Sequence, residues 1–279
     1  MANLIQALNH ILSQKDLLMA NETKRIVLKE ALQAYVLDYL YNHSTYRLLN
    51  FYGGTCLHIV YGLNRLSEDI DMDNSNTIDL LELENGLLRY FQLTVGYPDA
   101  TIKTQIGEQG IRRITLKFPI LYDLGLTSYP NESLHLKVEI SPHKQVSIIQ
   151  KTPILVYGHS FVSAHFSLET MMAGKMLACL ERNFQRGKEG VSVKGRDFYD
   201  LLWFMQKRIH PLEEKLQKDG SKPYTVPSAM LTLNEKIGSL KSADLAVDLL
   251  PLFEQRTFIE AWLEGFKDNF NELVKGYIY

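Results

Sequence analysis

The sequence predicts an α+β protein in which a mixed sheet flanked by helices is followed by a helical C-terminal region. Apolar and polar residues alternate with a period of two in segments 113–118 and 134–141, which is typical of half-buried strands. From residue 167 to the C-terminus the apolar residues recur at helical spacing. We therefore expect a first domain at residues 1–164 and a helical domain at residues 165–279.

The other expected elements follow from the same patterns. Residues 1–20 indicate an amphipathic helix, and a second helix is expected to begin at Asn21, with Asn21 as its cap. A further helix is expected at residues 78–93, and a last strand at residues 154–156. Residues 219–227 are rich in Gly, Pro and Ser and indicate a loop.

A tight glycine turn follows the first predicted strand. An apolar strand ending at Tyr52 leads into Gly53 and Gly54, and Thr55 is expected to open a short helix. Backbone N–H groups at the start of a helix have no partner within the helix and bind phosphate oxygens. The turn is therefore a candidate phosphate-binding site.

Two carboxylates follow this turn in the next predicted strand. Asp69 and Asp71 lie two residues apart and share one face of the strand, while Ile70 and Met72 face the core. Two carboxylates beside a triphosphate can hold Mg²⁺. The segment thus predicts a site for metal ions and a nucleoside triphosphate.

A third metal ligand is expected from a neighbouring strand. Glu139 is the best candidate because it lies on the polar face of segment 134–141. The alternative is a solvated carboxylate paired with Lys137. Asp73 follows on the face of Asp71 but is expected at the strand end, and we interpret it as peripheral.

Composition limits the other function classes. The chain has 279 residues, 46% of them apolar, and a formal net charge of −2, so RNA would have to bind a local basic patch. Cys56 and Cys179 are the only cysteines and have no zinc or disulfide spacing, which favours the reducing cytoplasm. No apolar run is long enough to cross a bilayer, so we expect no membrane partner.

The ordered motifs resemble a known family. Gly-Gly-Thr-x-Leu at residues 53–57, followed by Arg-x-Ser-x-Asp-x-Asp at residues 65–71, resembles the DNA polymerase beta-like nucleotidyltransferase superfamily, and within it the AbiEii/AbiGii toxin branch. The resemblance implies a nucleotidyltransferase core plus a helical domain. It also implies transfer of a nucleoside monophosphate from an NTP to a hydroxyl, with two Mg²⁺ ions bound by Asp69, Asp71 and Glu139. Gly-Gly-Thr replaces the superfamily's Gly-Ser, so any hydroxyl contact to phosphate passes to Thr55.

Two residues before the acids have alternative roles. By the resemblance, Ser67 contacts phosphate and Arg65 anchors the loop. Arg65 is equally well explained as an ion-pair partner of Glu68 or Asp73.

A second motif lies in the helical half. Lys175 and Arg182 project from one face of the helix that begins near Ser167, and Asp197 opens the next helix. In the resembled family the lysine is expected to meet the nucleotide phosphates, and the aspartate to position it or to join the active site; Arg182 would add a further phosphate contact. The alternative for Lys175 is a snorkelling surface lysine.

The segment between these helices is basic and contains glycines. It could bind an RNA backbone, or it could be a solvated connector. Its cations are Arg182, Arg186, Lys188, Lys194 and Arg196.

The resemblance suggests an acceptor at the end of a tRNA or another RNA, a cognate antitoxin protein and a role in phage defence. The alternatives are transfer to a small molecule or a protein hydroxyl, or a catalytically weak nucleotide-binding module.

Overall fold

The chain folds into two compact units. The structure is a computed structural model that describes residues 4–182, 184–185, 191–192 and 194–278. Unit 1 comprises residues 1–144 and 150–165, and unit 2 comprises residues 145–149 and 166–279. The predicted domain boundary after residue 164 lies one residue before the last crossing of the chain from unit 1 to unit 2.

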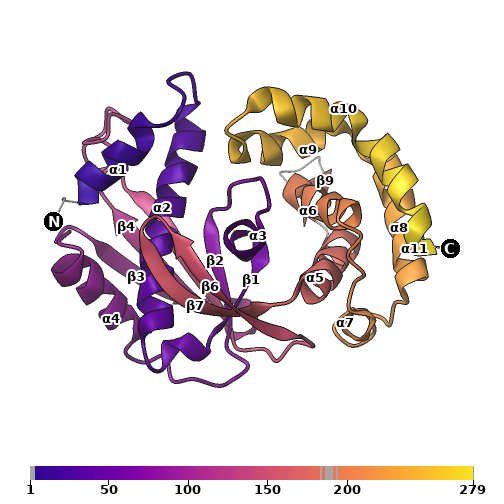
Figure 1. Cartoon of the computed structure of the whole chain (residues 1–279), viewed down its shortest axis with the longest axis horizontal. Coiled ribbons are helices and arrows are strands. Elements are labelled where there is room, and N and C mark those ends of the chain that lie inside the picture. The colour runs from indigo at the N-terminus through magenta and orange to yellow at the C-terminus, as the bar shows by residue number, and fades with distance from the viewer. Residues whose placement is uncertain (1–3, 183, 186–190, 193, 279) are drawn as a thin grey trace. The chain divides into compact units, whose positions relative to one another are not determined.

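Unit 1 is built on a seven-stranded mixed sheet with the strand order β3-β4-β5-β2-β1-β7-β6 (Figure 1). The strands are β1 (Asn50–Tyr52), β2 (Asp69–Asp73), β3 (Thr101–Ile106), β4 (Arg112–Phe118), β5 (Leu134–Ser141), β6 (Ile149–Val156) and β7 (His159–Phe166). Strand β2 runs parallel to β5 and antiparallel to β1, and β4 runs antiparallel to both of its neighbours. The predicted α+β fold with a mixed sheet is confirmed.

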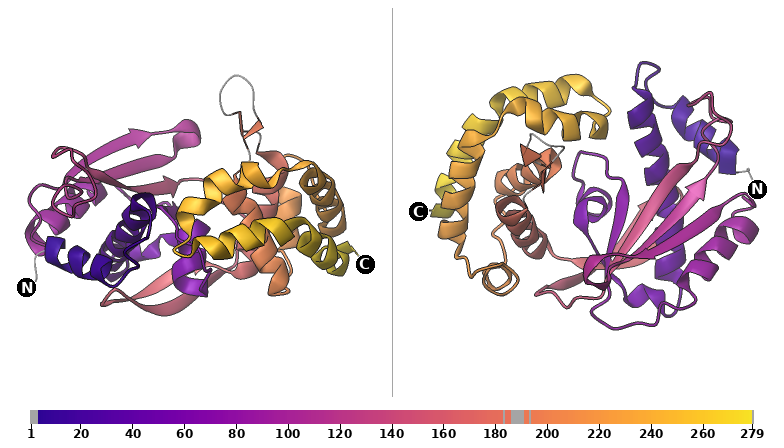
Figure 2. Two further views of the ribbon diagram at one scale, coloured as in Figure 1. Left: turned by 90° about the horizontal axis from the view of Figure 1, so that it is seen from above. Right: turned by 180° about the vertical axis from the view of Figure 1, so that it is seen from behind.

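Helices flank this sheet. They are α1 (Leu4–Ser13), α2 (Asn21–Asn42), α3 (Gly53–Tyr61) and α4 (Leu83–Arg89), with short helical turns at Tyr46–Leu48, Tyr90–Thr94 and Glu108–Gly110. Figures 1 and 2 show α1 beside α2 and α4 beside β3. The Tyr41 hydroxyl of α2 donates to the Ala164 carbonyl oxygen over 2.8 Å and lies 3.9 Å from Met72 Sδ, so α2 packs against the sheet.

The period of two in the sequence appears directly in the sheet. On β4, Ile114, Leu116 and Phe118 are fully buried. Burial of each such side chain contributes about 1.5–3 kcal/mol. Phe118 also packs edge-to-face on Phe91, with ring centroids 4.9 Å apart. The alternate residues of β4 and β5 must therefore project from the opposite, polar face of the sheet.

Several element boundaries differ from the sequence prediction. The helix expected at residues 78–93 begins only at Leu83 and ends in a π-helical turn, and Leu81 before it is 72% exposed. The first helix ends at Ser13, beyond which the side chains of Leu17 and Leu18 point into solvent. Helix α2 does begin at Asn21, but Ala20 occupies the N-cap position and no side chain caps the helix.

Unit 2 is predominantly helical, as predicted. It contains α5 (Leu168–Glu181), α6 (Gly195–Gln206), α7 (Glu213–Lys218), α8 (Val226–Ser239), α9 (Ser242–Leu249), α10 (Arg256–Leu273) and α11 (Lys275–Ile278), a short helical turn at Leu250–Leu252, and two-residue strands β8 (Phe184–Gln185) and β9 (Val191–Ser192). Helices α5 and α6 pack together, and α8 to α11 curve around them (Figures 1 and 2). Ser167 caps α5 by accepting a hydrogen bond from the Thr170 backbone N–H.

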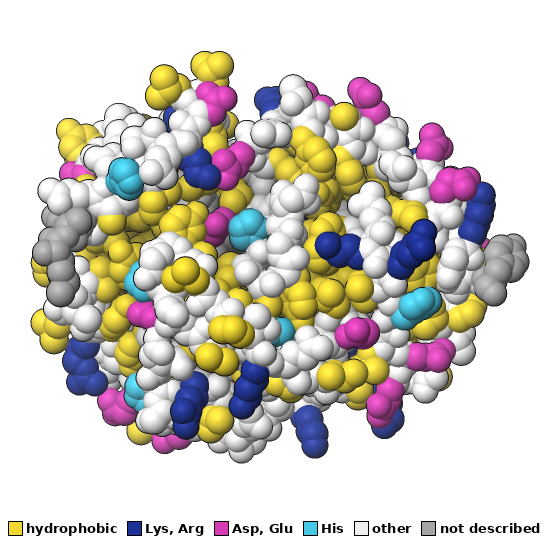
Figure 3. Space-filling model, in the orientation of Figure 1, with side chains coloured by type: hydrophobic (Ala, Val, Ile, Leu, Met, Phe, Trp, Pro, Cys, Tyr) yellow, Lys and Arg dark blue, Asp and Glu magenta, His cyan; other side chains and the backbone are white. Residues whose placement is uncertain are grey.

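Charge is dispersed over one face of the molecule (Figure 3). The face drawn in Figure 3 shows Lys and Arg side chains interspersed with Asp and Glu side chains, which agrees with the net charge of −2. Both cysteines are buried and unbridged. Within the described ranges, no helix combines the length and the apolar character that a membrane span requires.

Candidate active site

The glycine turn packs directly against the acidic strand. Strand β1 ends at Tyr52, and α3 begins at Gly53 rather than at Thr55 as predicted. Gly53 has a φ of +81°, and a Cβ added to it would lie 2.1 Å from Asp71 Oδ2. Position 53 therefore requires glycine for two reasons. Its backbone conformation favours glycine, and the Asp71 carboxylate occupies the space that a side chain would need.

The second glycine allows an equally close approach. A Cβ at Gly54 would lie 2.8 Å from both Arg65 Nη2 and Ser67 Oγ. The structure thus brings together four residues that the sequence analysis selected separately: the two glycines, Arg65 and Ser67. The backbone at the start of α3 therefore lies beside the Arg65 guanidinium and the Ser67 hydroxyl, and the first N–H groups of a helix are favourable donors to an anion.

Thr55 faces the interior. Its side chain is fully buried, and its hydroxyl donates to the backbone carbonyl oxygen of Asp69. Thr55 therefore fastens α3 to β2. The predicted contact between its hydroxyl and a phosphate does not fit this orientation, because the donor proton is already used inside the fold.

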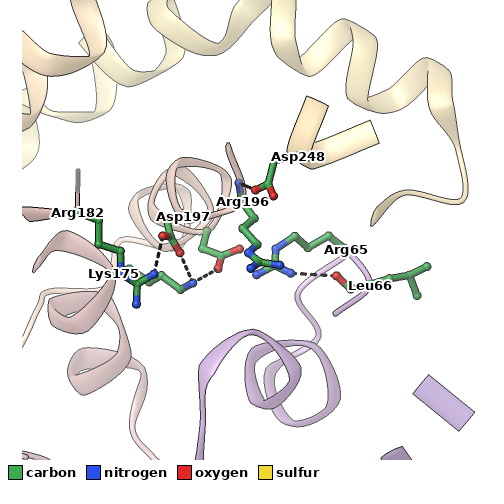
Figure 4. Close-up of polar contacts among 8 residues, drawn as sticks. Arg65, Leu66, Lys175, Arg182, Arg196, Asp197 and Asp248 are labelled. Carbon is green, nitrogen blue, oxygen red and sulfur yellow. Dashed lines mark hydrogen bonds and ion pairs between the residues drawn. The ribbon is translucent and has the colours of Figure 1, made fainter. Parts of the chain in front are cut away.

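The segment between α3 and β2 is held from several sides. Arg65 is 2% exposed and donates from Nη1 to the Leu66 carbonyl oxygen over 2.9 Å (Figure 4). Gln33 of α2 donates to the Ser67 carbonyl oxygen over 2.9 Å. Lys29 forms a salt bridge of 2.7 Å with Glu68, one of the two acids considered as ion-pair partners of Arg65.

Asp69 and Asp71 lie where the strand period predicts. Both are half-buried on one face of β2, while Ile70 and Met72 are fully buried on the other. Burial raises the pKa of the Asp69 carboxyl; Lys137 acts in the opposite direction, and the negative charges of Glu68 and Glu139 add to the rise. Crowded carboxylates of this kind gain from a bound cation.

Asp73 ends the strand and is buried. It accepts a hydrogen bond of 3.0 Å from the Asn50 side chain and one of 3.2 Å from the backbone N–H of Ser75. These contacts give Asp73 a structural task at the end of β2.

Glu139 lies directly opposite Asp71 in the parallel pairing of β5 with β2. Its partner is Arg113 of β4, which donates from Nε to Glu139 Oε1 over 2.6 Å. Among the described residues, no salt bridge joins Glu139 to Lys137, which is the register partner of Asp69. The third predicted acid is therefore beside the other two but is engaged by a guanidinium.

The three acids fit Mg²⁺ in chemical kind, because carboxylate oxygens are its preferred protein ligands. Their side chains are not assembled into a metal site. Among the described residues, no three His, Cys, Asp or Glu side chains lie close enough together to hold a metal ion. Asp69 and Asp71 are aligned for this task. Glu139 would first have to release Arg113.

A second cluster lies within unit 2. Lys175 Nζ contacts Asp197 Oδ1 at 2.7 Å and Asp200 Oδ2 at 2.8 Å, and Arg182 Nη1 contacts Asp197 Oδ2 at 3.1 Å (Figure 4). The Lys175 side chain is only 15% exposed, which argues against a snorkelling lysine. Burial opposes ionisation of Asp197, yet Lys175 and Arg182 hold its pKa below the usual range.

Asp200 was not selected from the sequence. It lies three residues after Asp197 on α6, so both carboxylates share one helix face, and this spacing is a signal that could have identified it. Lys194 and Arg196 lie close to Asp197 in the chain. The backbone N–H of Arg196 donates to the Asp248 carboxylate. Burial lowers the pKa of the Lys194 ammonium, and the neighbouring cations Arg196 and Arg182 lower it further. Arg186 and Lys188 of the predicted basic loop lie outside the described residues.

One of three comparisons with known proteins identifies a family. The family model described as "Nucleotidyl transferase AbiEii toxin, Type IV TA system" matches residues 38–277. A solved structure of a candidate nucleotidyltransferase from H. pylori is 20% identical in sequence, with 88% of this chain and 92% of that chain covered and a TM-score of 0.49. A comparison with curated proteins found no match.

Proposed function

The chain belongs to the AbiEii family of nucleotidyl transferase toxins, and from this premise we propose that it transfers a nucleoside monophosphate from an NTP to a hydroxyl at an RNA end in a Mg²⁺-dependent reaction. The family assignment makes the chain a nucleotidyltransferase toxin of a type IV toxin–antitoxin system. It implies an NTP substrate and a cognate antitoxin. The metal, the residues and the acceptor are our proposal.

The contact between Gly53 and Asp71 is the observation that carries the proposal. The Asp71 carboxylate, a group of the kind that binds metal ions, lies next to the start of α3. The first N–H groups of a helix have no partner within the helix and favour phosphate. In this assignment the turn at residues 53–54 and Ser67 bind triphosphate oxygens, and Arg65 braces the turn. Asp69 and Asp71, joined by Glu139 after it releases Arg113, would hold Mg²⁺, which supplies neutralisation of the triphosphate charge.

The transfer itself is a single displacement. The acceptor hydroxyl oxygen forms a bond to the α-phosphorus, the bond from that phosphorus to the bridging oxygen breaks, and pyrophosphate leaves with the electron pair. The hydroxyl proton passes to solvent. Such a reaction is accelerated mainly by positioning and by charge neutralisation, so we expect the residues that hold the phosphates to matter most.

In unit 2, Lys175 is the proposed phosphate contact, and Asp197 and Asp200 are the residues that position it. Arg182 is a second proposed contact because its side chain is 51% exposed although it is anchored to Asp197. A lysine fixed by two carboxylates is oriented before substrate binds, which lowers the entropic cost of each phosphate contact.

Transfer of α-labelled NTPs to total bacterial RNA tests the proposal. Each NTP is incubated with Mg²⁺ and either the wild type, the Asp69→Asn/Asp71→Asn variant, or the control variant Asp99→Asn/Asp123→Asn, which changes charge equally at exposed positions of unit 1. We expect labelled RNA with the wild type and the control alone. Label on protein or on a small molecule would refute the RNA acceptor, and transfer by the Asp69→Asn/Asp71→Asn variant would refute the assigned residues.

A further inference from the structure

Charged side chains on strands β2 to β5 are sorted by sign across the polar face of the sheet. The registers place Asp69 opposite Lys137, Lys137 opposite Thr115, and Thr115 opposite Lys103. The acids lie on β2 and at the neighbouring position of β5, and the cations extend from there toward β3. We call the following set the basic face: Lys103 on β3, Arg113 and Lys117 on β4, and Lys137 on β5.

The basic face is compact enough to act as one surface. Adjacent strands lie about 4.8 Å apart, so Lys103 and Lys137 are separated by about 10 Å across β4. Arg113 and Lys117 are four residues apart on one strand, or about 13 Å. The surface begins next to Asp69 and ends at β3, the edge strand of the sheet.

Three of the four cations are available to a ligand. Lys103 is exposed, and Lys117 and Lys137 are half-buried. None of the three forms a hydrogen bond or a salt bridge with the residues that the structure describes. Arg113 differs, because Glu139 holds its guanidinium.

The electrostatic environment supports this description. His135 lies opposite Lys117 on β5. Burial lowers the pKa of its imidazole, and the positive charges of Lys117, Lys29 and Lys137 lower it further. The contribution of the three lysines reflects a positive potential at this position, and such a potential attracts an anion.

We propose that the basic face binds the sugar–phosphate backbone of a single-stranded RNA acceptor. The inference rests on the proposed function, since it takes the acceptor to be RNA and adds the surface that binds it. The cations extend away from the triphosphate turn at residues 53–54, so they suit a chain that continues beyond its reactive end. Flexible lysines contact phosphates as point charges and carry no sequence information.

The basic face is a different location from the Arg182–Arg196 segment, for which sequence analysis left an RNA site and a solvated connector as alternatives. The cations of that segment lie close together in the chain. The basic face consists of cations from three strands, and only the strand register brings them together. A chain with net charge −2 needs such local sorting to attract a polyanion.

The salt dependence of RNA binding tests the proposal. The probe is a short fluorescein-labelled single-stranded oligoribonucleotide of mixed sequence, measured by anisotropy with full-length protein and without NTP or metal. The logarithm of the association constant falls with the logarithm of salt concentration by about 0.7 per phosphate contact on single strands. We expect Lys103→Gln/Lys117→Gln to weaken binding and to reduce this slope by about 1.4, twice the single-contact value.

Lys144→Gln/Lys151→Gln is the matched control, because it removes the same charge at exposed positions of unit 1 outside the basic face. Its slope should equal that of the wild type. Equal slopes for the two double variants, or a wild type that binds no RNA at low salt, would overturn the basic face as an RNA site.

NTP affinity is measured in parallel and should be unchanged in Lys103→Gln/Lys117→Gln. Loss of NTP binding with RNA binding intact would assign the basic face to the triphosphate and overturn the proposal. Since the RNA measurement contains no transfer step, its failure is distinguishable from failure of the proposed enzymatic activity.

Discussion

Replacing Gly53 by alanine should separate the position of Asp71 from the stability of the fold. An alanine at position 53 would adopt a φ near +81° and would place its Cβ 2.1 Å from Asp71 Oδ2. An ordinary contact is at least 3.4 Å, so the two groups must separate by about 1.3 Å, the difference between these distances. The carboxylate is the side that can move, because the turn is fixed between β1 and α3.

The magnitude follows from two separate costs. The left-handed backbone conformation costs a residue other than glycine about 1–2 kcal/mol. A displacement of about 1 Å at a reacting group can reduce the rate by about 100-fold, which corresponds to about 2.7 kcal/mol in the activation free energy. Gly62 isolates the first cost, since its φ is +72° and an added Cβ would have no atom within 4 Å.

Both variants are measured by urea unfolding and by kcat/KM for NMP transfer well below the melting temperature. We expect Gly62→Ala to lose about 1–2 kcal/mol of unfolding free energy while its transfer rate stays near that of the wild type. Gly53→Ala should lose at least as much stability and about 100-fold in kcat/KM. If Gly53→Ala transferred within a few-fold of Gly62→Ala, the position of Asp71 would not control the reaction.

Three other predictions concern ion pairs. His58 binds Glu30 at 3.0 Å; burial opposes its protonation, but Glu30 outweighs this and raises the pKa of His58, while the pKa of Glu30 is lowered. The wild type should therefore have a higher free energy of unfolding than His58→Gln, and the difference should be greatest between about pH 4.5 and 6.5. The difference should fall as pH rises through the raised pKa of His58, and it should be lost in acid as Glu30 becomes protonated. Urea unfolding at several pH values measures it. Lys175→Met removes the cation that contacts both Asp197 and Asp200 and should lose about 3–5 kcal/mol of unfolding free energy, more than Lys175→Arg, and equal stability of the two variants would contradict this explanation. Arg113→Gln should tighten Mn²⁺ binding by up to about 5-fold in calorimetry, because a half-exposed pair with Glu139 contributes no more than about 1 kcal/mol, and unchanged binding would contradict the competition.

Local sequence patterns were sufficient for the central part of the fold. The alternation at Ile114, Leu116 and Phe118 predicted β4, and the pair Asp69 and Asp71 was placed on the correct strand face. Both are properties of neighbouring residues, since the period of a strand fixes which side chains share a face. The fold class could be predicted from the sequence for the same reason, because the periods of strands and helices are properties of neighbouring residues.

Other features depend on neighbours that sequence spacing does not reveal. Strand β3 lies at the sheet edge and nearly all of its side chains are exposed, so it has no alternation to detect. The ion pair of Arg113 with Glu139 joins residues 26 apart and follows from the β4–β5 register. Sequence analysis assigned a phosphate contact to the Thr55 hydroxyl. Spacing along the chain does not reveal that this hydroxyl donates to the Asp69 carbonyl oxygen, which belongs to a different element.

The position of the candidate metal ligands is fixed by apolar residues. A slip of β2 by one residue would turn Ile70 and Met72 from the core to the polar face, at a cost of about 3–6 kcal/mol for two fully buried side chains. The same slip would carry Asp69 and Asp71 into the core, where unpaired carboxylates are far more costly. Because a domain of ordinary stability has only about 5–15 kcal/mol in total, the slipped register is not populated. The alignment of Asp71 with Glu139 is therefore a consequence of hydrophobic burial, and the register of the two strands is set before any metal or nucleotide binds.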